Sequence, residues 1–194
     1  MDHEQQELLR FIWGSLGEAT TKRTSFTLAY LATVDANNAP RLRGLILRGF
    51  DAEEGSVSFT TNTKSAKADE IRRNPLVALA AIDSDAGVQL RMDGRAEIVE
   101  DPAERQRAWD ALGPQTRVLY RSPLTPGAPL ESNPGTDSSA AHSSESKENA
   151  EFERFAWVRV RLEQLDWLDI SSKTHKRCRF IREGNHWASE WIAP

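Results

Sequence analysis

The chain has 194 residues, of which 39% are hydrophobic and 28% charged, and its formal net charge is −4 at pH 7. These values fit one globular domain, the apolar runs are too short to span a membrane, and the acidic balance gives little support for general nucleic-acid binding. The single cysteine, Cys178, excludes an internal disulfide framework. Because the first residues also lack the pattern of a secretion signal, we expect a cytoplasmic protein.

Amphipathic patterns predict two or three helices among the strands. Apolar residues at helical intervals predict a first helix at residues 5–16, which we expect to end at Gly17. Ser65 is the expected N-cap of a second helix that runs through Arg73, and Pro102 opens a third.

Short runs of β-branched and aromatic residues predict strands over most of the chain. Asn, Asp and Gly turn signals separate these runs, which favours antiparallel strands joined by tight turns. Gly94 interrupts one run, and we expect a bulge or bend there. Strand–helix alternation is missing, so the pattern favours a mainly β antiparallel barrel with peripheral helices. The expected strands cover residues 24–34, 41–50, 56–61, 76–82, 88–99, 156–170, 178–182 and 187–192.

From residue 122 to residue 150 the composition changes to Ser, Pro, Gly, Asn and Glu, with few large apolar side chains. Such a segment buries too little surface to offset its ordering entropy. We therefore expect a mobile loop at 122–150 within a single domain that covers 1–194. Long loops are often functional, so a lid over an active site is the alternative to plain disorder.

The stretch from Pro40 to Lys67 carries the clearest functional signal. A strand bracketed by Arg43 and Arg48 precedes a strand that ends in polar residues just before a predicted helix. Cations, hydroxyls and a helix N-terminus together are what a bound phosphate monoester requires. A solvated strand face followed by an ordinary helix cap is the simpler interpretation. The polar residues are Thr60, Thr61, Asn62, Thr63, Lys64, Ser65 and Lys67.

Other kinds of site lack support in the sequence. Neither G-x-x-x-x-G-K-[ST] nor G-x-G-x-x-G occurs, so the common phosphate-binding and dinucleotide-binding loops are missing. The 4 histidines are scattered without zinc spacing, and no G-x-S-x-G nucleophile motif occurs. We expect no metal site.

Five segments in this order resemble the pyridoxamine 5′-phosphate oxidase family of FMN-binding split barrels. They are PRLRGLILR, FTTNTKSAKA, NP, QLRMDGRA and THKR…W…AP, which begin at Pro40, Phe59, Asn74, Gln89 and Thr174. The resemblance implies a six- to seven-stranded antiparallel split β-barrel that binds FMN. It also implies a homodimer in which both subunits build each flavin site. The expected activity is oxidation of a small molecule by hydride transfer to the flavin.

The resemblance implies three substrate-binding positions. Arg48 stands where the family has a lysine between flavin and substrate. His175 matches the histidine of the family's R-x-H element, and Lys173 replaces its arginine. These three residues are the expected catalytic residues, because they would position an anionic substrate.

The same resemblance implies a set of flavin contacts. Gln89 would reach the flavin edge as donor and acceptor, and Arg177 matches the arginine of R-x-H-x-R. Trp167 would flank the ring, with Leu168 in its place if the alignment slips by one residue. The expected cofactor-binding residues are Arg43, Gly44, Leu45, Ile46, Leu47, Arg48, Thr60, Thr61, Lys64, Ser65, Lys67, Gln89, Trp167 and Arg177.

Besides Arg48 and Lys173, the chain departs from the family at two further places. Ala66 replaces a phosphate-binding arginine, and Lys64 is the candidate to compensate, although a lysine is a point charge and not a fork. Trp109, Leu112 and Thr116 stand where authentic oxidases hold pyridoxal phosphate. Flavin binding is therefore better supported than pyridoxamine phosphate oxidation. The alternatives are an authentic oxidase, a flavin-binding module without turnover, and a split barrel that has exchanged flavin for haem or a deazaflavin.

Overall fold

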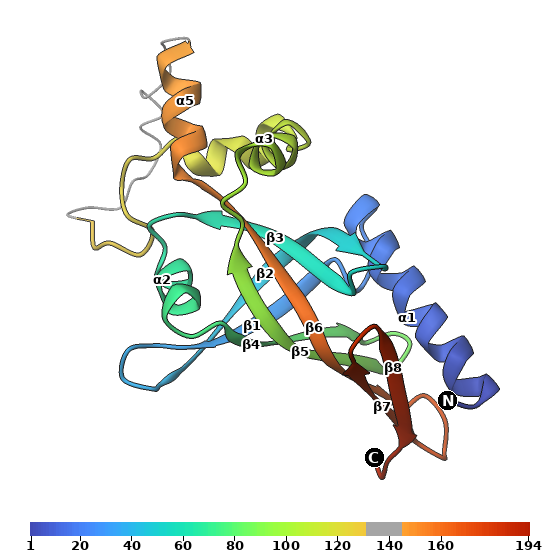
Figure 1. The fold of residues 1–194 in the computed structure, drawn as a ribbon. Helices are drawn as coiled ribbons and strands as arrows, with labels where there is room; N and C mark the ends of the chain where they lie inside the picture. Colours follow the sequence, from blue (N-terminus) through green and yellow to red (C-terminus); the bar gives the residue numbers. More distant parts are fainter. Residues whose placement is uncertain (131–144) are drawn as a thin grey trace.

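An antiparallel β-barrel forms the centre of the computed structural model, which describes residues 1–130 and 145–194 (Figure 1). Its strands are β1 (Leu28–Val34), β2 (Pro40–Asp51), β3 (Ser56–Asn62), β4 (Leu76–Asp83), β5 (Val88–Ile98), β6 (Phe155–Asp169), β7 (Lys176–Glu183) and β8 (His186–Trp191). They form one sheet in the order β3-β2-β1-β4-β5-β6-β7-β8, and β3 also pairs with β6. This last pairing closes β1 to β6 into a barrel, and β7 and β8 extend the sheet beyond it. The predicted mainly β barrel is confirmed.

Helices lie at the periphery of the barrel (Figure 1). The first helix packs along β2, the second packs against β1 and β5, and the remaining helices gather near the start of β6. They are α1 (His3–Thr21), α2 (Ala66–Arg73), α3 (Pro102–Asp110), α4 (Pro114–Arg117), the 3-10 helix η1 (Val118–Tyr120) and α5 (Glu145–Arg154).

Two element boundaries differ from the prediction. Helix α1 continues through Gly17 to Thr21, because the buried Ala19 extends its apolar stripe. β1 starts at Leu28 and not at residue 24. The cause is a turn in which the Thr27 hydroxyl accepts a hydrogen bond from the backbone N–H of Thr24 at 2.8 Å.

The expected loop at 122–150 is only partly a loop. Residues 131–144 lie outside the described residues, and residues 145–150 form the first part of α5. The composition argument failed there because Glu, Lys and Ala favour a helix. The ring of Phe152 then anchors α5 on Trp109, with 5.9 Å between the ring centroids.

Two hydrophobic clusters hold these elements together. The larger cluster fills the barrel and seats α1 through the fully buried Ile12 and Leu16. The smaller cluster is aromatic: Trp109 meets Tyr120 and Phe155 edge-on, with centroid distances of 5.7 and 5.4 Å. Such pairs add to the stability that burial provides. The aromatic cluster therefore ties α3 and η1 to the start of β6.

Cys178 lies fully buried in β7. Burial raises the pKa of its thiol to about 11, with smaller contributions from nearby carboxylates. A buried, protonated thiol behaves as a small hydrophobic group. Its role in the fold is to fill the core.

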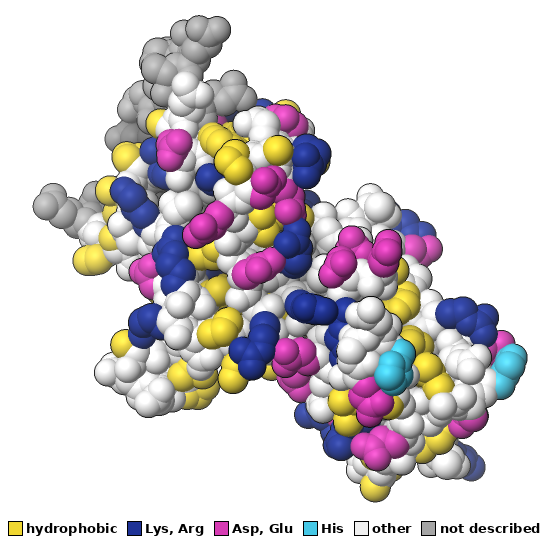
Figure 2. Space-filling model, in the orientation of Figure 1, with side chains coloured by type: hydrophobic (Ala, Val, Ile, Leu, Met, Phe, Trp, Pro, Cys, Tyr) yellow, Lys and Arg dark blue, Asp and Glu magenta, His cyan; other side chains and the backbone are white. Residues whose placement is uncertain are grey.

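The surface carries mixed charge. On the face drawn in Figure 2, basic and acidic side chains alternate over the barrel and the helices. Among the helices of the described residues, none has both the length and the apolar character needed to cross a bilayer.

Gly94 of β5 faces a bulge in β6, where the sequence predicted a bulge or bend, because Glu163 is skipped between the pairs Asp93–Gln164 and Gly94–Leu162. The pairing register of β5 and β6 shifts between Asp93 and Gly94. A Cβ atom at Gly94 would lie 2.2 Å from the carbonyl oxygen of Arg161. The two backbones therefore approach so closely that only glycine fits.

Gly94→Ala is expected to destabilise the protein by about 2 kcal/mol or more, because the new methyl group forces β5 and β6 apart. Urea unfolding measures the loss. Gly14→Ala is the control, since no atom lies within 4 Å of its Cβ position in α1. That change should stabilise the protein by about 0.5–1 kcal/mol. A Gly94→Ala protein as stable as wild type would contradict the close approach.

Candidate functional site

A cluster of cations and hydroxyls lies at one end of the barrel, at the N-terminus of α2. The Ser65 hydroxyl caps the helix by accepting a hydrogen bond from the Ala68 N–H at 3.3 Å. It also shares a hydrogen bond of 2.9 Å with the Thr61 hydroxyl. Lys67 Nζ donates to Thr61 Oγ1 at 3.1 Å. We call Arg43, Thr61, Ser65 and Lys67 the basic cluster.

Arg43 is anchored inside the barrel end by two side chains. Its Nη2 donates to Glu70 Oε2 at 2.7 Å, and its Nη1 donates to the Thr33 hydroxyl. That hydroxyl donates in turn to the same Glu70 oxygen at 2.5 Å. Because Glu70 and Thr33 are buried, the guanidinium is held in one position.

Lys67 carries the second positive charge of the basic cluster. Burial and the adjacent Arg43 guanidinium lower the pKa of its ammonium group, and Glu70 raises that pKa by a smaller amount. A bound anion would relieve the repulsion between the two cations. With two hydroxyls and a helix N-terminus beside them, these residues fit a phosphate group.

Lys64 stays outside this network. It is exposed, and its backbone N–H donates to Asn62 Oδ1 at 2.9 Å. Ala66 is also exposed, in the first turn of α2. Position 66, where the family has an arginine, is therefore exposed to solvent. Arg43 and Lys67 supply the positive charge of the basic cluster.

The residues of β2 alternate between the two faces of the sheet, as the sequence predicted. Leu45 and Leu47 point into the barrel, and Gly44, Ile46 and Arg48 lie on the outer face. The inner face thus packs the core, and the outer face is open to a ligand or a partner.

Arg48 lies near the end of β2, beside α4 and η1. Its Nη2 is 3.4 Å from Thr116 Oγ1. Close by, the buried phenol of Tyr120 shares a hydrogen bond with the Thr60 side chain. Burial raises the pKa of Tyr120, while Thr60 and Arg48 lower it by less. The sequence pattern did not single out Tyr120. It is an aromatic residue just before a polar segment, and this is weak evidence for a role in the site.

Gln89, Leu168 and Arg177 form a row across β5, β6 and β7. Leu168 pairs with both of the others, so all three lie on the same outer face. Trp167 points to the opposite face and packs in the core, 5.5 Å from the ring of Phe11. Trp167 therefore does not share the outer face of Gln89 and Arg177. A shift of one residue changes the face of a strand residue, and Leu168 stands beside Gln89 and Arg177.

Arg177 is held by a buried aspartate that the sequence pattern did not single out. Asp166, with 3% of its surface exposed, accepts hydrogen bonds from Arg177 Nε at 2.9 Å and Nη2 at 2.8 Å, and from Arg91 Nη2 at 2.6 Å. Burial raises the pKa of Asp166, but the hydrogen bonds from Arg177 and Arg91 outweigh it and hold the pKa below its usual value. The sequence does contain a signal for this site: Asp166 is a carboxylate within a predicted strand, and arginines occur in the strands expected on either side of it.

Lys173 and His175 lie exposed in the turn between β6 and β7. This turn adjoins the start of α1, where Lys176 Nζ meets Glu4 Oε1 at 2.8 Å. Arg48 instead lies beside α3 and α4, at the other end of the molecule (Figure 1). Within one chain, the structure does not bring Arg48 together with Lys173 and His175.

One chain therefore presents two separate groups of expected site residues. The basic cluster and Arg48 belong to β2, β3 and α2. Gln89, Arg177 and the β6–β7 turn belong to the part of the sheet that β7 and β8 extend (Figure 1). We call these groups the two half-sites.

Sequence comparison assigns the chain to a known group of proteins. The sequence profile of the pyridoxamine 5′-phosphate oxidase family matches residues 17–166, which is more than half of the chain. The chain belongs to this family.

Relatives in the pyridoxamine 5′-phosphate oxidase family match most of the chain. A pyridoxine/pyridoxamine 5′-phosphate oxidase 2 of Arabidopsis thaliana is 25% identical over 197 residues, which covers 95% of this chain and 96% of the relative. A pyridoxine/pyridoxamine 5′-phosphate oxidase of Rubrobacter xylanophilus is 30% identical over 168 residues, which covers 84% of this chain and 76% of the relative.

Solved structures show the same fold. A pyridoxamine 5′-phosphate oxidase-related FMN-binding protein of Nostoc punctiforme has a TM-score of 0.75 and 23% identity, and the match covers 95% of this chain and 96% of that one. PhzG of Burkholderia lata, solved with tetrahydrophenazine-1-carboxylic acid, has a TM-score of 0.70 and 20% identity, with 97% and 92% coverage. At these identities the likeness establishes the split-barrel fold of the family and nothing about ligands.

Asp166→Asn is expected to lower the free energy of unfolding at pH 7 by about 1–2 kcal/mol, because it removes the carboxylate that two arginines share. The pKa of Asp166 is depressed in the folded protein. Its contribution is therefore complete above the ordinary value of 3.8 and is lost as the pH falls through the folded-state pKa. Urea unfolding at neutral and acidic pH should show wild type and variant converging in acid.

Glu163→Gln is the matched control for this change. Glu163 pairs with Arg95 at 3.0 Å on the same two strands, but both side chains are about half exposed. An exposed pair of this kind contributes less than about 1 kcal/mol. Equal losses in the two variants at pH 7 would contradict the anchoring role of Asp166.

Proposed function

We propose that this protein is an FMN-dependent oxidoreductase that acts on a small anionic molecule and works as a homodimer with shared flavin sites. Membership of the pyridoxamine 5′-phosphate oxidase family supports flavin-linked oxidoreductase chemistry in general terms, and the Nostoc punctiforme neighbour is an FMN-binding protein. We propose the cytoplasm as its compartment, which the content of one cysteine supports. The observation that carries the proposal is the basic cluster.

The basic cluster fits the phosphate of FMN. A phosphate monoester carries close to two negative charges, and Arg43 and Lys67 offer two positive charges beside the Thr61 and Ser65 hydroxyls. Each charge-assisted hydrogen bond contributes roughly 1.5–3 kcal/mol. Because Glu70 already fixes Arg43, little side-chain entropy is lost when the anion binds.

The other expected residues would position the substrate and the ring. FMN bound at this site supplies a two-electron acceptor for a hydride, and the protein supplies position and electrostatics. Arg48 would hold the anionic group of the substrate. Gln89 would donate to and accept from polar atoms at the ring edge, and Asp166 would keep Arg177 oriented toward the same region.

A second copy of the chain would complete the site. Within one chain the two half-sites lie apart, and the outer face of β1, β2 and β4 exposes six large apolar side chains. Apolar side chains gathered on one face are typical of an interaction surface. Two copies packed through this face would bring opposite half-sites together. The six residues are Leu28, Tyr30, Leu42, Ile46, Leu76 and Ile82.

Titration with FMN, followed by flavin fluorescence, tests the cofactor. We expect saturable binding, which Lys67→Ala weakens by about tenfold or more. A bound phosphate raises the pKa of Lys67, which is lowered in the free protein. Wild-type affinity should therefore fall as the pH rises through the free-protein pKa, below the ordinary value of 10.5. Protein that takes up no FMN would refute the cofactor.

Two variants serve as controls for this titration. Lys67→Arg keeps the charge at all accessible pH values and should flatten the pH dependence. Lys64→Ala removes an exposed charge one turn away and should leave the affinity nearly unchanged. If Lys64→Ala weakened binding as much as Lys67→Ala, the assignment of the basic cluster would be wrong.

Leu42→Asp is expected to convert the proposed dimer to a monomer and to weaken FMN binding, because it places a charge in the apolar face. Light scattering after size exclusion measures the mass. Leu119→Asp is the matched control, since Leu42 and Leu119 are 70% and 71% exposed and Leu119 lies in η1, outside this face. Wild-type protein that binds FMN fully as a monomer would contradict the proposal that two subunits share each flavin site.

An authentic oxidase of pyridoxamine 5′-phosphate is the second candidate, because the relatives carry that name. Trp109, which the resemblance places where authentic oxidases hold their substrate, is buried in the aromatic cluster, and this argues against that candidate. Formation of pyridoxal 5′-phosphate measures this activity directly. A bound flavin that neither amines nor NAD(P)H reduce would favour a binding module without turnover.

A further inference from the structure

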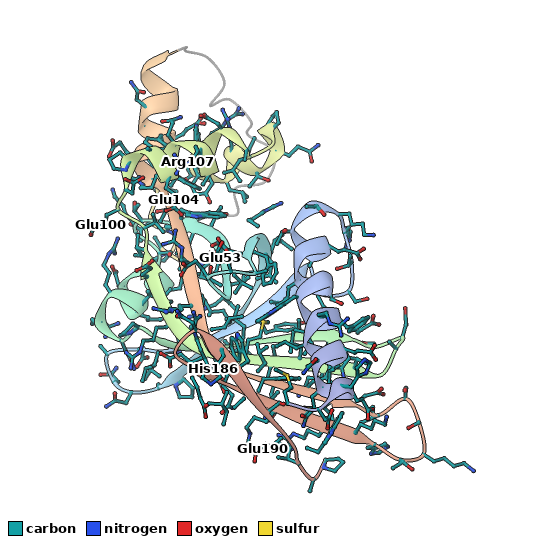
Figure 3. All side chains as sticks on the ribbon, turned by 45° about the vertical axis from the view of Figure 1, so that its right-hand side comes forward. Glu53, Glu100, Glu104, Arg107, His186 and Glu190 are labelled. Carbon is teal, nitrogen blue, oxygen red and sulfur yellow. The ribbon has the colours of Figure 1, made fainter. Side chains whose placement is uncertain are left out.

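A pocket of about 220 Å³ lies between α1, the segment just before β1 and the turn that joins β4 and β5. Helix α1 runs beside this turn in both views of the ribbon (Figure 1 and Figure 3). The volume is below the roughly 300–1,000 Å³ of sites that hold larger ligands. The pocket therefore suits a ligand of few heavy atoms, and the preceding sections give it no role.

Three aromatic rings line this pocket, from α1, the segment before β1, and β6. The rings of Phe11 and Phe26 stand edge-on to the indole of Trp167, with interplanar angles of 84° and 88° and centroid distances of 5.5 and 6.3 Å. Phe26 and Trp167 are each 6% exposed, whereas Phe11 is 56% exposed and forms the outer wall. Two rings perpendicular to a third form an aromatic cage of the kind that holds quaternary ammonium ions.

The charged side chains that line the pocket are both acidic. They are Glu18 of α1 and Asp83 at the end of β4. The Ala86 N–H donates to Asp83 Oδ1 at 3.0 Å. This hydrogen bond lowers the pKa of Asp83, burial opposes it, and the Ser25 hydroxyl lowers the pKa further. Glu18 pairs with the exposed Lys22 at 3.1 Å, but Asp83 forms no ion pair with any described residue. The pocket therefore offers one ionised carboxylate that no basic side chain balances.

We propose that this pocket binds a small quaternary ammonium ion, with its methyl groups against the rings of Phe11, Phe26 and Trp167 and its charge beside Asp83. Aromatic faces and the carboxylate both attract a cation. Methyl groups on the nitrogen suit walls that accept no ordinary hydrogen bonds. A primary ammonium would leave some of its three N–H donors without partners there.

The pocket is separate from the residues assigned to the flavin. Trp167 points to the face of β6 opposite Leu168, and Leu168 is the residue that lies beside Gln89 and Arg177. The pocket lining shares no residue with the basic cluster. Ammonium binding therefore does not depend on the proposed function, and we expect it with and without FMN.

Calorimetric titration of the full chain with choline tests the proposal. Choline should bind saturably. Its uncharged analogue, in which a tert-butyl group replaces the trimethylammonium group, should bind at least about tenfold more weakly. Phe11→Leu keeps an apolar side chain but removes the ring, and it should weaken choline binding by about fivefold or more. Phe11→Tyr keeps the ring and should bind choline as the wild type does.

Asp83→Asn tests the role of the charge. The amide oxygen can still accept a hydrogen bond from the Ala86 N–H, so the turn is retained while choline binding weakens by about fivefold or more. Asp85→Asn is the matched control, because Asp85 is an exposed carboxylate in the same turn and does not line the pocket. There the affinity should change by less than about twofold.

Three results would overturn the proposal: no binding of choline, equal affinity for choline and its uncharged analogue, or equal losses in Asp83→Asn and Asp85→Asn. A second probe, N-acetyl trimethyllysine amide, identifies the source of the ammonium group. Tighter binding of choline indicates a free ligand, and tighter binding of the lysine derivative indicates a methylated side chain of another protein.

Flavin absorbance of the same samples separates this proposal from the proposed function. Protein that holds FMN but binds neither ammonium probe refutes the pocket alone. Protein that binds choline and takes up no FMN supports the pocket and refutes the flavin assignment.

Discussion

The rest of the structure depends on β6, because this one strand pairs with three others. Its first half pairs with β3 and β5 and closes the barrel, and its second half pairs with β5 and β7 and carries the sheet outward. A strand of 15 residues is long enough to do both, provided that Gly94 lets β5 come close. β6 starts at the aromatic cluster and reaches Asp166 near its other end. The helices beside Arg48 and the anchor of Arg177 are therefore attached to the same rigid element.

The chain uses its arginines in two physically different ways. Arg43 and Arg177 are each tied to a buried carboxylate, Glu70 or Asp166, which orients the guanidinium before any ligand arrives. Arg48 lacks such a partner among the described residues and lines an open pocket. Oriented cations suit a cofactor that stays bound, since little entropy is lost on binding. Cations without a partner suit a ligand that must enter and leave.

Much of the fold could be predicted from local patterns, because period-two alternation, turn residues and caps act over a few neighbouring residues. Ser65 as the N-cap and Gly94 at a bulge are such cases. The closure of the barrel by β3 and β6 could not be predicted, since no local pattern links residues so far apart. Alternation also tells which residues share a face of β6 but not which face is buried when both contain large apolar groups. The expectation of Trp167 beside the flavin rests on the family resemblance and not on alternation, and no local pattern signals the burial of Asp166 and Tyr120.

The burial of Cys178 has a consequence for how copies of the chain associate. It is the one sulfhydryl in the sequence, it lies wholly inside the core, and its raised pKa keeps it protonated at neutral pH. A thiol in this state neither reaches another molecule nor attacks it. Folded copies therefore cannot be cross-linked by oxidation. Noncovalent association of copies would then follow mass action on dilution.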